Sequence, residues 1–399
     1  MTVTDRSDPR HAPAAWLLPA EAYTSQAWFD REQEALFEQC WAFAGMTDDL
    51  PDVGDYLTLT VGRQPIVVVR SPDGDLRAFH NLCRHRGAQL LEGTGNVARG
   101  ISCFYHRWRY DLDGALTTVP QPEQFPDLCR EDWGLKPAAI DTWNGLVFVH
   151  PDPVPDQDLA TWLGRIPERM GPYEPLELME IPTVRHEINA NWKLFLENHV
   201  DGYHLWHLHA KSIRGLAHNR QDWEPTGRHW TLYEPSIKDG DHADQTLTGL
   251  PLIPTVPADG YGSSVQLVFP NLAMAGGSTF WTTIHVTPKA PDRTEVVMRT
   301  RIARIRTPKD ARLLARLGLR ESLKTLGRTP IGAALRSLHV LADTDDDAAA
   351  FVAEDIFAAE SLQRAIASPR FEVGPMATDY ENAITFFQQN ILDYTQPPS

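Results

Sequence analysis

The spacing of apolar positions predicts a helix first and short strands after it. Apolar side chains recur at helical spacing from Gln26 to Trp41, which indicates an amphipathic helix. The period then changes to that of strands rich in Val, Leu and Thr. Strands are predicted at residues 56–61, 65–70, 75–80 and 145–149. Residues 150–158 have the composition of a linker, so the first part of the chain is predicted to be a small all-β domain.

The remainder of the chain mixes helices with longer strands. Strands are predicted at residues 264–269, 279–286 and 294–302. Three helices are expected to close the chain, and the last begins at the capping box Thr378-x-x-Glu381 and ends near Tyr394. Grouped strands followed by grouped helices favour an α+β fold over a doubly wound sheet.

Length and charge limit the classes of function. The 399 residues suffice for two or three domains at about 150 residues each. Acidic residues exceed basic ones by 53 to 37, so the chain repels nucleic-acid phosphates and anionic lipid surfaces. No apolar leader and no apolar run long enough for a membrane span occur. We therefore expect a cytoplasmic protein with neither nucleic acid nor membrane as a partner.

Two of the four cysteines lie close to histidines. Four cysteines are too few for a disulfide scaffold in a chain of this length, so ligand roles are favoured. Cys83-x-His85 and Cys103-x-x-His106 each offer one thiolate and one imidazole. Structural zinc is an alternative, but zinc sites usually pair Cys with Cys and His with His. The mixed pairs fit a [2Fe–2S] cluster better, with one iron held by the cysteines and the other by the histidines.

This pattern, C-x-H, seventeen residues, then C-x-x-H, resembles the Rieske cluster motif. Such proteins often have Gly-Trp after the second histidine, whereas this chain has Arg107-Trp108. A nearby G-x-G-x-x-A match at residues 93–98 is not followed by a helical pattern, so we do not assign it to a dinucleotide. NAD(P)H is therefore expected to be bound by a separate protein.

A second group of candidate ligands lies near residue 200. Four of the 15 histidines fall within residues 199–209. On a regular helix, Glu197, Asp201 and His204 would share one face. His207 would also face the same way as His204, while His209 would point about 140° away, so periodicity alone favours His207.

A third candidate ligand lies in the predicted helix that ends at Ile366. On a helical wheel Asp355 falls in the middle of an apolar stripe, and Glu360 falls on the opposite, solvated face. A carboxylate in such a stripe is costly unless it binds a metal or forms an ion pair, for instance with an arginine. The stripe consists of Phe351, Ala358, Leu362 and Ile366.

Both segments resemble those of Rieske non-haem iron oxygenases, the alpha (terminal oxygenase) subunits of the ring-hydroxylating oxygenase family. The matching patterns are N-W-K-x-x-x-E-N-x-x-D-x-Y-H-x-x-x-x-H at residues 191–209 and E-D-x-x-x-x-E-x-x-Q at residues 354–363. The resemblance implies a mononuclear Fe(II) bound by His204, His209 and Asp355, with the helix unwound between the histidines and His207 kept as the alternative. It also implies an all-β Rieske domain and an α+β catalytic domain whose antiparallel sheet is covered by helices. The expected division is an N-terminal leader and helix packed on the catalytic domain (1–42), the Rieske domain (43–155) and the catalytic domain (156–399).

The resemblance further implies how electrons reach this iron. In such homotrimers the carboxylate at the position of Asp201 bridges the Rieske histidine of one subunit and the mononuclear site of the next. Asn198 and Tyr203 are expected beside the iron ligands. The electron donor would be a ferredoxin, a flavin reductase or both.

The implied activity is oxygenation of a small organic substrate by O2. Two residues separate Asn198 from Asp201, as in monooxygenating and demethylating members, including those that act on betaine-like quaternary ammonium compounds. Aromatic ring hydroxylation is the alternative. A Rieske electron carrier or redox sensor, which needs only the first 150 residues or so, is an alternative of another class. Candidates for a cation-binding aromatic cage are Trp206, Trp230, Phe269, Phe280 and Trp281.

Overall fold

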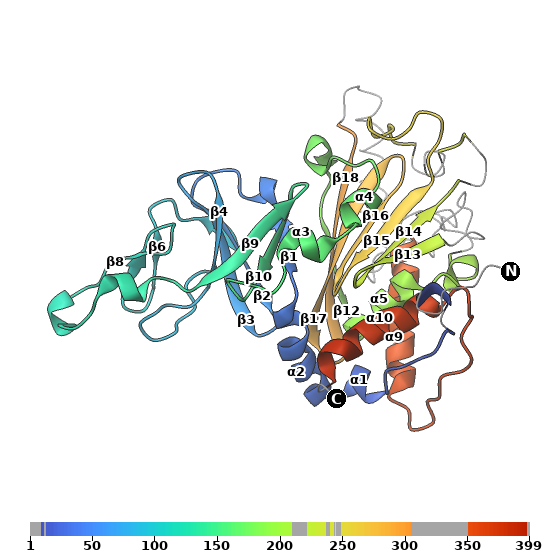
Figure 1. The fold of residues 1–399 in the computed structure, drawn as a ribbon, viewed down its shortest axis with the longest axis horizontal. Coiled ribbons are helices and arrows are strands. Elements are labelled where there is room, and N and C mark those ends of the chain that lie inside the picture. Colours follow the sequence, from blue (N-terminus) through green and yellow to red (C-terminus); the bar gives the residue numbers. More distant parts are fainter. Residues whose placement is uncertain are drawn as a thin grey trace, which may run out of the picture. The chain divides into compact units, whose positions relative to one another are not determined.

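The computed structural model describes residues 9–11, 13–209, 222–236, 240–242, 244, 249–304 and 350–396. The chain divides into two compact units (Figure 1). We call residues 25–164 and 390–399 the β unit, and residues 1–24 and 165–389 the α+β unit. This division confirms the expected class, an all-β N-terminal domain joined to an α+β domain.

The N-terminal segment is divided between the units, in contrast to the expected single segment 1–42. Helix α2 (Gln26–Ala35) ends earlier than the apolar pattern suggested, and a 3₁₀ turn (Phe37–Gln39) follows it. Glu38 in this turn accepts hydrogen bonds from Arg63 (3.0 Å) and Gln64 (3.1 Å) at the hairpin between β2 (Asp55–Val61) and β3 (Gln64–Arg70). These contacts help to hold the turn after α2 against this hairpin, inside the β unit.

A seven-stranded antiparallel sheet and a three-stranded one form the β unit. The predicted strands are found within about two residues of their expected bounds. The large sheet has the order β1 (Ala42–Met46), β10 (Leu146–His150), β9 (Pro137–Trp143), β4 (Leu76–His80), β3 (Gln64–Arg70), β2 (Asp55–Val61) and β5 (Thr94–Asn96). The small sheet has the order β6 (Ile101–Ser102), β7 (Arg109–Tyr110) and β8 (Leu116–Thr118), and helix α3 (Leu159–Leu163) follows the last strand of the unit.

Strand β3 separates two hydrophobic cores of the β unit. Its side chains alternate between the two faces of the sheet, as the two-residue period of a strand requires. Val67 and Val69 belong to the core that also contains Cys83 and Cys103. Ile66 and Val68 enter the other core. A strand buried on both faces therefore supports the loops that carry the cysteines.

An eight-stranded antiparallel sheet forms the base of the α+β unit, and the three strands predicted there correspond to β15, β17 and β18. The strands are β11 (Met179–Glu180), β12 (Val184–Ile188), β13 (Asp222–Thr226), β14 (His229–Glu234), β15 (Ser263–Val268), β16 (Leu272–Gly276), β17 (Phe280–Ala290) and β18 (Arg293–Ile302). The helices are α1 (Glu21–Thr24), α4 (Ile166–Arg169), α5 (Trp192–Val200), α9 (Ala350–Ile366) and α10 (Asn382–Thr395).

Helix α5 lies in the centre of this unit. It begins at Asn191, whose side chain caps the helix by accepting a hydrogen bond from the Lys193 N–H (3.1 Å). The helix packs against α9 and β17, and Trp192 contacts Phe387 of α10 edge to face. Because almost every side chain of α5 is buried, its C-terminal end holds its residues in fixed positions inside the unit.

Two expectations about the closing helices need correction. Helix α10 begins at Asn382, not at the predicted capping box, because Glu381 accepts a hydrogen bond from the Ala377 N–H and so closes a turn before the helix. Residues 305–349, where part of the expected helical region falls, lie outside the described residues. In the part of the chain that is described, helices are too short or too polar to cross a lipid bilayer.

Candidate metal centres

Two loops at the tip of the β unit share one backbone pattern. In each, the N–H of the residue four positions after the cysteine donates to the cysteine carbonyl: Gly87 to Cys83 (2.9 Å) and Arg107 to Cys103 (3.0 Å). Each cysteine N–H in turn donates to the carbonyl of the residue five positions later. The two halves of the motif are therefore superimposable turns that face each other.

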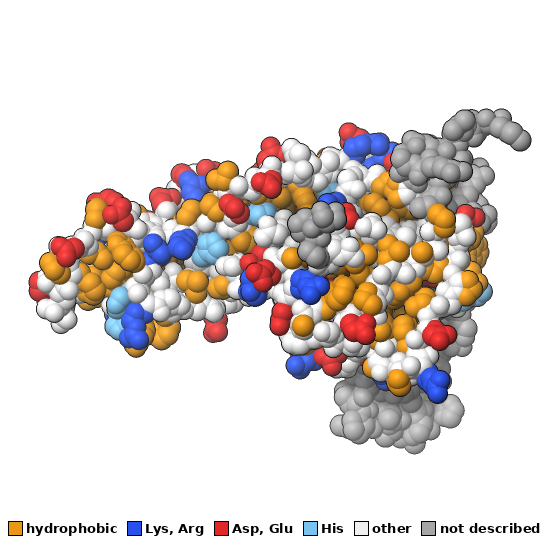
Figure 2. Space-filling model, turned by 60° about the horizontal axis from the view of Figure 1, so that its bottom comes forward, with side chains coloured by type: hydrophobic (Ala, Val, Ile, Leu, Met, Phe, Trp, Pro, Cys, Tyr) orange, Lys and Arg blue, Asp and Glu red, His pale blue; other side chains and the backbone are white. Residues whose placement is uncertain are grey.

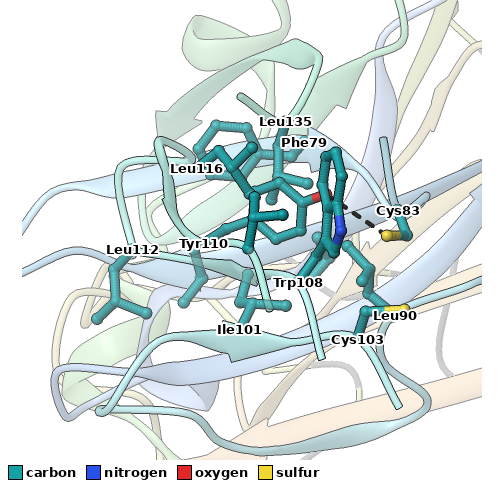
Figure 3. Packing of buried hydrophobic residues seen from close by; sticks show 13 residues of the cluster. Phe79, Cys83, Leu90, Ile101, Cys103, Trp108, Tyr110, Leu112, Leu116 and Leu135 are labelled. Atoms are coloured by element: carbon teal, nitrogen blue, oxygen red, sulfur yellow. Dashed lines mark hydrogen bonds between the residues drawn. The ribbon is translucent and has the colours of Figure 1, made fainter. Parts of the chain in front are cut away.

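These turns bring the four predicted ligands together. The Nδ1 atoms of His85 and His106 lie 3.1 Å apart. Cys83 and Cys103 are both buried in one hydrophobic cluster, which Figure 3 shows. Burial raises the pKa of the Cys83 thiol, whose sulfur lies 3.5 Å from the hydroxyl of Tyr110. A thiolate at this position therefore needs a cation, and two imidazole nitrogens directed at one point can bind the same iron. The donor set fits a Rieske [2Fe–2S] cluster.

The two histidines have different surroundings. The His85 ring stacks on Trp108, with ring centroids 5.0 Å apart and planes 8° from parallel, and burial lowers its pKa. The His106 ring lies 3.8 Å from the exposed Tyr105, which also contacts the guanidinium of Arg86. Figure 2 shows histidine and basic side chains together with hydrophobic ones on the surface at this end of the β unit.

Arg107 occupies a backbone conformation that suits glycine. Its φ of 59° is left-handed, and the equivalent residue of the first turn, Gly87, has a φ of 74°. The turn is therefore formed without the glycine that related motifs have, at a cost of about 1–2 kcal/mol for a side chain in this region.

Replacing Arg107 with glycine should stabilise the β unit. We expect the free energy of unfolding to rise by about 1 kcal/mol, because the strain disappears while the unfolded chain gains some entropy. The matched control is Gly87→Ala, which should lower it by a similar amount, since a Cβ there meets no atom within 4 Å and only the backbone conformation is penalised. The loss of cluster absorption on heating gives an unfolding midpoint temperature for each variant. Equal midpoints for Arg107→Gly and the parent would contradict the proposed backbone strain at Arg107.

The predicted mononuclear ligands also converge. Ligand atoms of His204, His209 and Asp355 all lie within 4.8 Å of one another. Asp355 Oδ1 is 2.9 Å from His209 Nε2 and 3.8 Å from His204 Nε2. His209 is buried, and only 14% of the His204 and Asp355 side chains is exposed. Two imidazoles and one carboxylate that converge in this way are the donor set of a non-haem Fe(II) site.

The end of α5 explains why His209 and not His207 reaches Asp355. The helix stops at Val200, and after Gly202 the chain continues as a 3₁₀ turn, His204–Trp206. The regular helix on which periodicity favoured His207 is therefore interrupted before His204. His207 is exposed and lies against the Tyr203 ring, whereas His209 turns inward.

Polar neighbours hold this donor set. Asn198 Nδ2 donates to Asp355 Oδ1 (2.7 Å), and Asp201 Oδ2 lies 3.3 Å from His204 Nδ1. The other oxygen of Asp201 accepts the Tyr203 N–H (2.6 Å). Tyr203 thus acts here through its backbone, since its ring is half exposed and lies between His207 and Tyr380.

The buried face of α9 differs from the predicted stripe. Asp355 does lie on the inner side of the helix, but the other buried residues there are Ala359, Gln363 and Ile366. Leu362, expected in the stripe, is 46% exposed, and Glu360, expected in solvent, accepts hydrogen bonds from Asn189. The side chain of Phe351 lies outside the described residues. Glu360 and Gln363 thus have polar partners on neighbouring elements, which a helical wheel does not take into account.

The predicted helical face of Glu197, Asp201 and His204 is also wrong. Glu197 points away from the donor set and binds the Tyr23 hydroxyl (2.6 Å) and Gln388 Nε2 (2.9 Å). The Asp201 N–H still donates to the Glu197 carbonyl (3.0 Å), but α5 ends there and His204 lies in a 3₁₀ turn, so the helical spacing does not extend to His204. Glu197 is thus part of a buried structural network.

The aromatic candidates have different positions. Phe269 and Trp281 are fully buried core residues, and Phe269 packs on Phe387. Trp206 is 44% exposed. Trp230 is buried beside His199, with ring centroids 6.0 Å apart, and thus lies near the end of α5. The Trp230 indole therefore contacts helix α5, which leads to His204 and His209.

Sequence reasoning missed two residues of this region. Glu354 Oε2 lies 2.8 Å from His209 Nδ1, although only its neighbour Asp355 was singled out. His199 Nε2 lies 3.2 Å from the Gln266 carbonyl, and burial lowers its pKa to about 4, so it is neutral at pH 7. The sequence signal that could have pointed to Glu354 is its position directly before Asp355, the carboxylate expected to be buried.

Comparisons with known proteins agree with both centres. Residues 40–137 match the family described as Rieske [2Fe-2S] domain, and residues 176–397 match Ring hydroxylating alpha subunit (catalytic domain). The glycine betaine monooxygenase oxygenase subunit of Pseudomonas aeruginosa is 36% identical over 205 residues, which are 50% of this chain and 46% of that protein. The carnitine monooxygenase oxygenase subunit of Escherichia coli is 32% identical over 250 residues, 60% of this chain and 66% of that one. Biphenyl 2,3-dioxygenase subunit alpha of Rhodococcus jostii is 36% identical over 209 residues, 50% of this chain and 42% of that one.

Solved structures show the same fold. A quaternary ammonium Rieske monooxygenase in complex with L-carnitine has a TM-score of 0.72 at 22% identity, covering 99% of this chain and 100% of that one. Naphthalene 1,2-dioxygenase from Rhodococcus sp. has a TM-score of 0.68 at 21% identity, covering 96% of both.

The sequence matches span about half the length of the first of these curated relatives. The two matched domains imply a Rieske [2Fe–2S] cluster and a mononuclear iron, and the donor sets described above fit both. The catalytic-domain match alone covers more than half of the chain. The chain therefore belongs to the ring-hydroxylating alpha-subunit family of Rieske non-haem iron oxygenases.

Proposed function

We propose that this protein is a terminal oxygenase that uses O2 to hydroxylate an N-methyl carbon of a small quaternary ammonium or N-methyl compound. Its electrons come from a separate NAD(P)H-dependent reductase, with or without a ferredoxin. The observation that carries the proposal is the convergence of His204, His209 and Asp355 in a largely buried site. An electron carrier or redox sensor would have no use for this second donor set.

In this proposal each centre has defined ligands. Cys83, His85, Cys103 and His106 would hold the cluster, and His204, His209 and Asp355 would hold Fe(II). When bound, the cluster would supply electrons and the iron would activate O2 for attack on the substrate. Asn198 orients the Asp355 carboxylate by its 2.7 Å hydrogen bond. The buried position of His209 keeps bulk water away from this side of the site.

Asp201 would connect the two kinds of centre. Its position 3.3 Å from His204 Nδ1, with one oxygen held by the Tyr203 N–H, supports a role next to the iron ligands but not as one of them. We place it between His204 and the Rieske histidine of an adjoining copy in a homotrimer. Two of the four cysteines, Cys83 and Cys103, would be cluster ligands, and we place the protein in a reducing, cytoplasmic location.

Three features support the quaternary ammonium class. The relatives include oxygenase subunits named for carnitine and glycine betaine. The two-residue spacing between Asn198 and Asp201 is that of monooxygenating members. Trp230 is buried beside His199, and an indole face attracts a cation that has lost its water. Aromatic ring hydroxylation is the second candidate, favoured by the 36% identity to biphenyl 2,3-dioxygenase subunit alpha.

O2 uptake by the purified full chain with a surrogate reductase separates these candidates. One O2, two electrons and two protons convert the N-methyl group to N-hydroxymethyl and give one water. The N-hydroxymethyl group then loses formaldehyde and leaves the demethylated amine. We expect uptake with glycine betaine or carnitine and one formaldehyde per O2. Uptake with benzoate or biphenyl and none with the betaines would assign the protein to ring hydroxylation instead.

A further inference from the structure

The His209 ring lies between two consecutive carboxylates of α9. Its Nε2 is 2.9 Å from Asp355 Oδ1, and its Nδ1 is 2.8 Å from Glu354 Oε2. His209 is 2% exposed, while 30% of the Glu354 side chain is exposed. The imidazole is thus inside the protein, and one of the two carboxylates that hold it has contact with solvent.

His204 is held differently. Its Nδ1 lies 3.3 Å from Asp201 Oδ2, yet this nitrogen makes no hydrogen bond of good geometry within the described residues. The two imidazoles that face Asp355 therefore differ in the contact of their Nδ1 atoms. His209 Nδ1 lies 2.8 Å from a carboxylate oxygen, and His204 Nδ1 lies 3.3 Å from one.

We infer that Glu354 is a positioning residue that sets the tautomer and orientation of His209 and thereby the affinity of the site for its metal. The inference rests on the proposed function, in which His204, His209 and Asp355 hold Fe(II). It assigns Glu354 no contact with the substrate or with the metal itself.

The chemistry of the neutral imidazole explains the effect. A neutral histidine carries one ring proton, and only the nitrogen without it can bind a metal. When Nδ1–H donates to Glu354, the lone pair of Nε2 is directed toward Asp355 and the point where the metal would lie. The His209 side chain is 2% exposed, so water has little access to Nδ1 as long as a side chain of similar length occupies the place of Glu354. Loss of such a partner typically weakens metal binding by about 10- to 100-fold.

The test is a titration of the full chain, with its cluster in place and its mononuclear site emptied by a chelator, with Co(II). Glu354→Met keeps the length of the side chain but removes the acceptor, and Glu354→Gln keeps an amide oxygen that can accept the same proton. We expect the Co(II) dissociation constant to rise by about 10- to 100-fold in Glu354→Met. It should stay within about threefold of the parent in Glu354→Gln, with the visible Co(II) spectrum retained.

Glu360→Met is the matched control, because Glu360 lies on the same helix and accepts hydrogen bonds from Asn189 instead. It should bind Co(II) like the parent. Parent-like affinity in Glu354→Met, or equal weakening in Glu354→Gln and Glu354→Met, would overturn the inference. The proposed function fails separately, if the parent binds no Co(II) or if His204→Ala binds it as tightly as the parent.

Discussion

Replacing Asp355 with alanine should remove the mononuclear iron and leave the cluster intact. Iron content is expected to fall from about three per chain to about two. Turnover is expected to fall by at least about 1,000-fold, since the metal contributes several kcal/mol to the reaction. The reason is geometric: Asp355 Oδ1 is 2.9 Å from His209 Nε2 and 3.8 Å from His204 Nε2, so it is the carboxylate that completes the set.

His207→Ala is the control for this loss. His207 is exposed and packs on Tyr203, so its removal should leave three irons and near-normal turnover. Visible absorption of the cluster shows that the β unit is folded, and far-UV circular dichroism shows that the α+β unit is folded, in each variant. If Asp355→Ala keeps its third iron, or if His207→Ala loses it, the assigned ligand set is wrong.

The variant Asp201→Asn should lose turnover and keep both metal centres. We expect a fall of about 100-fold or more, because the amide keeps the size of the side chain but loses the charge beside His204 Nδ1. Iron content and the cluster spectrum should equal those of the parent. After reduction by the reductase, the cluster of the variant should stay reduced in the presence of substrate and O2, while that of the parent is reoxidised.

Mixed assemblies distinguish a bridge between copies from a role inside one chain. Asp201→Asn has a working cluster, and Cys83→Ser, which removes a cluster ligand, leaves the α+β unit unchanged. If electrons pass from one copy to the next, co-assembled variants should regain part of the activity that each lacks alone. Near-normal turnover of Asp201→Asn, or no recovery on mixing, would contradict the proposed bridge.

The sequence predicted regular elements well where one pattern dominates. Val67 and Val69 face one core and Ile66 and Val68 the other, so the continuous apolar run of β3 predicted a strand within one residue of its bounds. The Cys–His pairs were equally informative, because two mixed pairs on two turns fit few metal centres other than a Rieske [2Fe–2S] cluster. Asp355 was recognised for a similar reason, since a carboxylate in a buried face needs a partner.

Tertiary contacts decided what the sequence could not. His207 was favoured by helical periodicity, but the helix ends at Val200 and the argument no longer applies to the residues after it. Leu362 is exposed, while Gln363 turns inward and accepts a hydrogen bond from the Asn191 N–H. Glu354 could not be assigned from spacing, because its role depends on where His209, 145 residues earlier in the chain, is placed.

Anomalous diffraction at the iron absorption edge, from crystals of the full chain grown with its iron, tests the central claim most directly. The account predicts one isolated iron peak in the α+β unit, bound by His204 Nε2, His209 Nε2 and Asp355, apart from the paired iron of the cluster between Cys83, His85, Cys103 and His106. A lone peak on His207, or no peak between these three side chains, would contradict it.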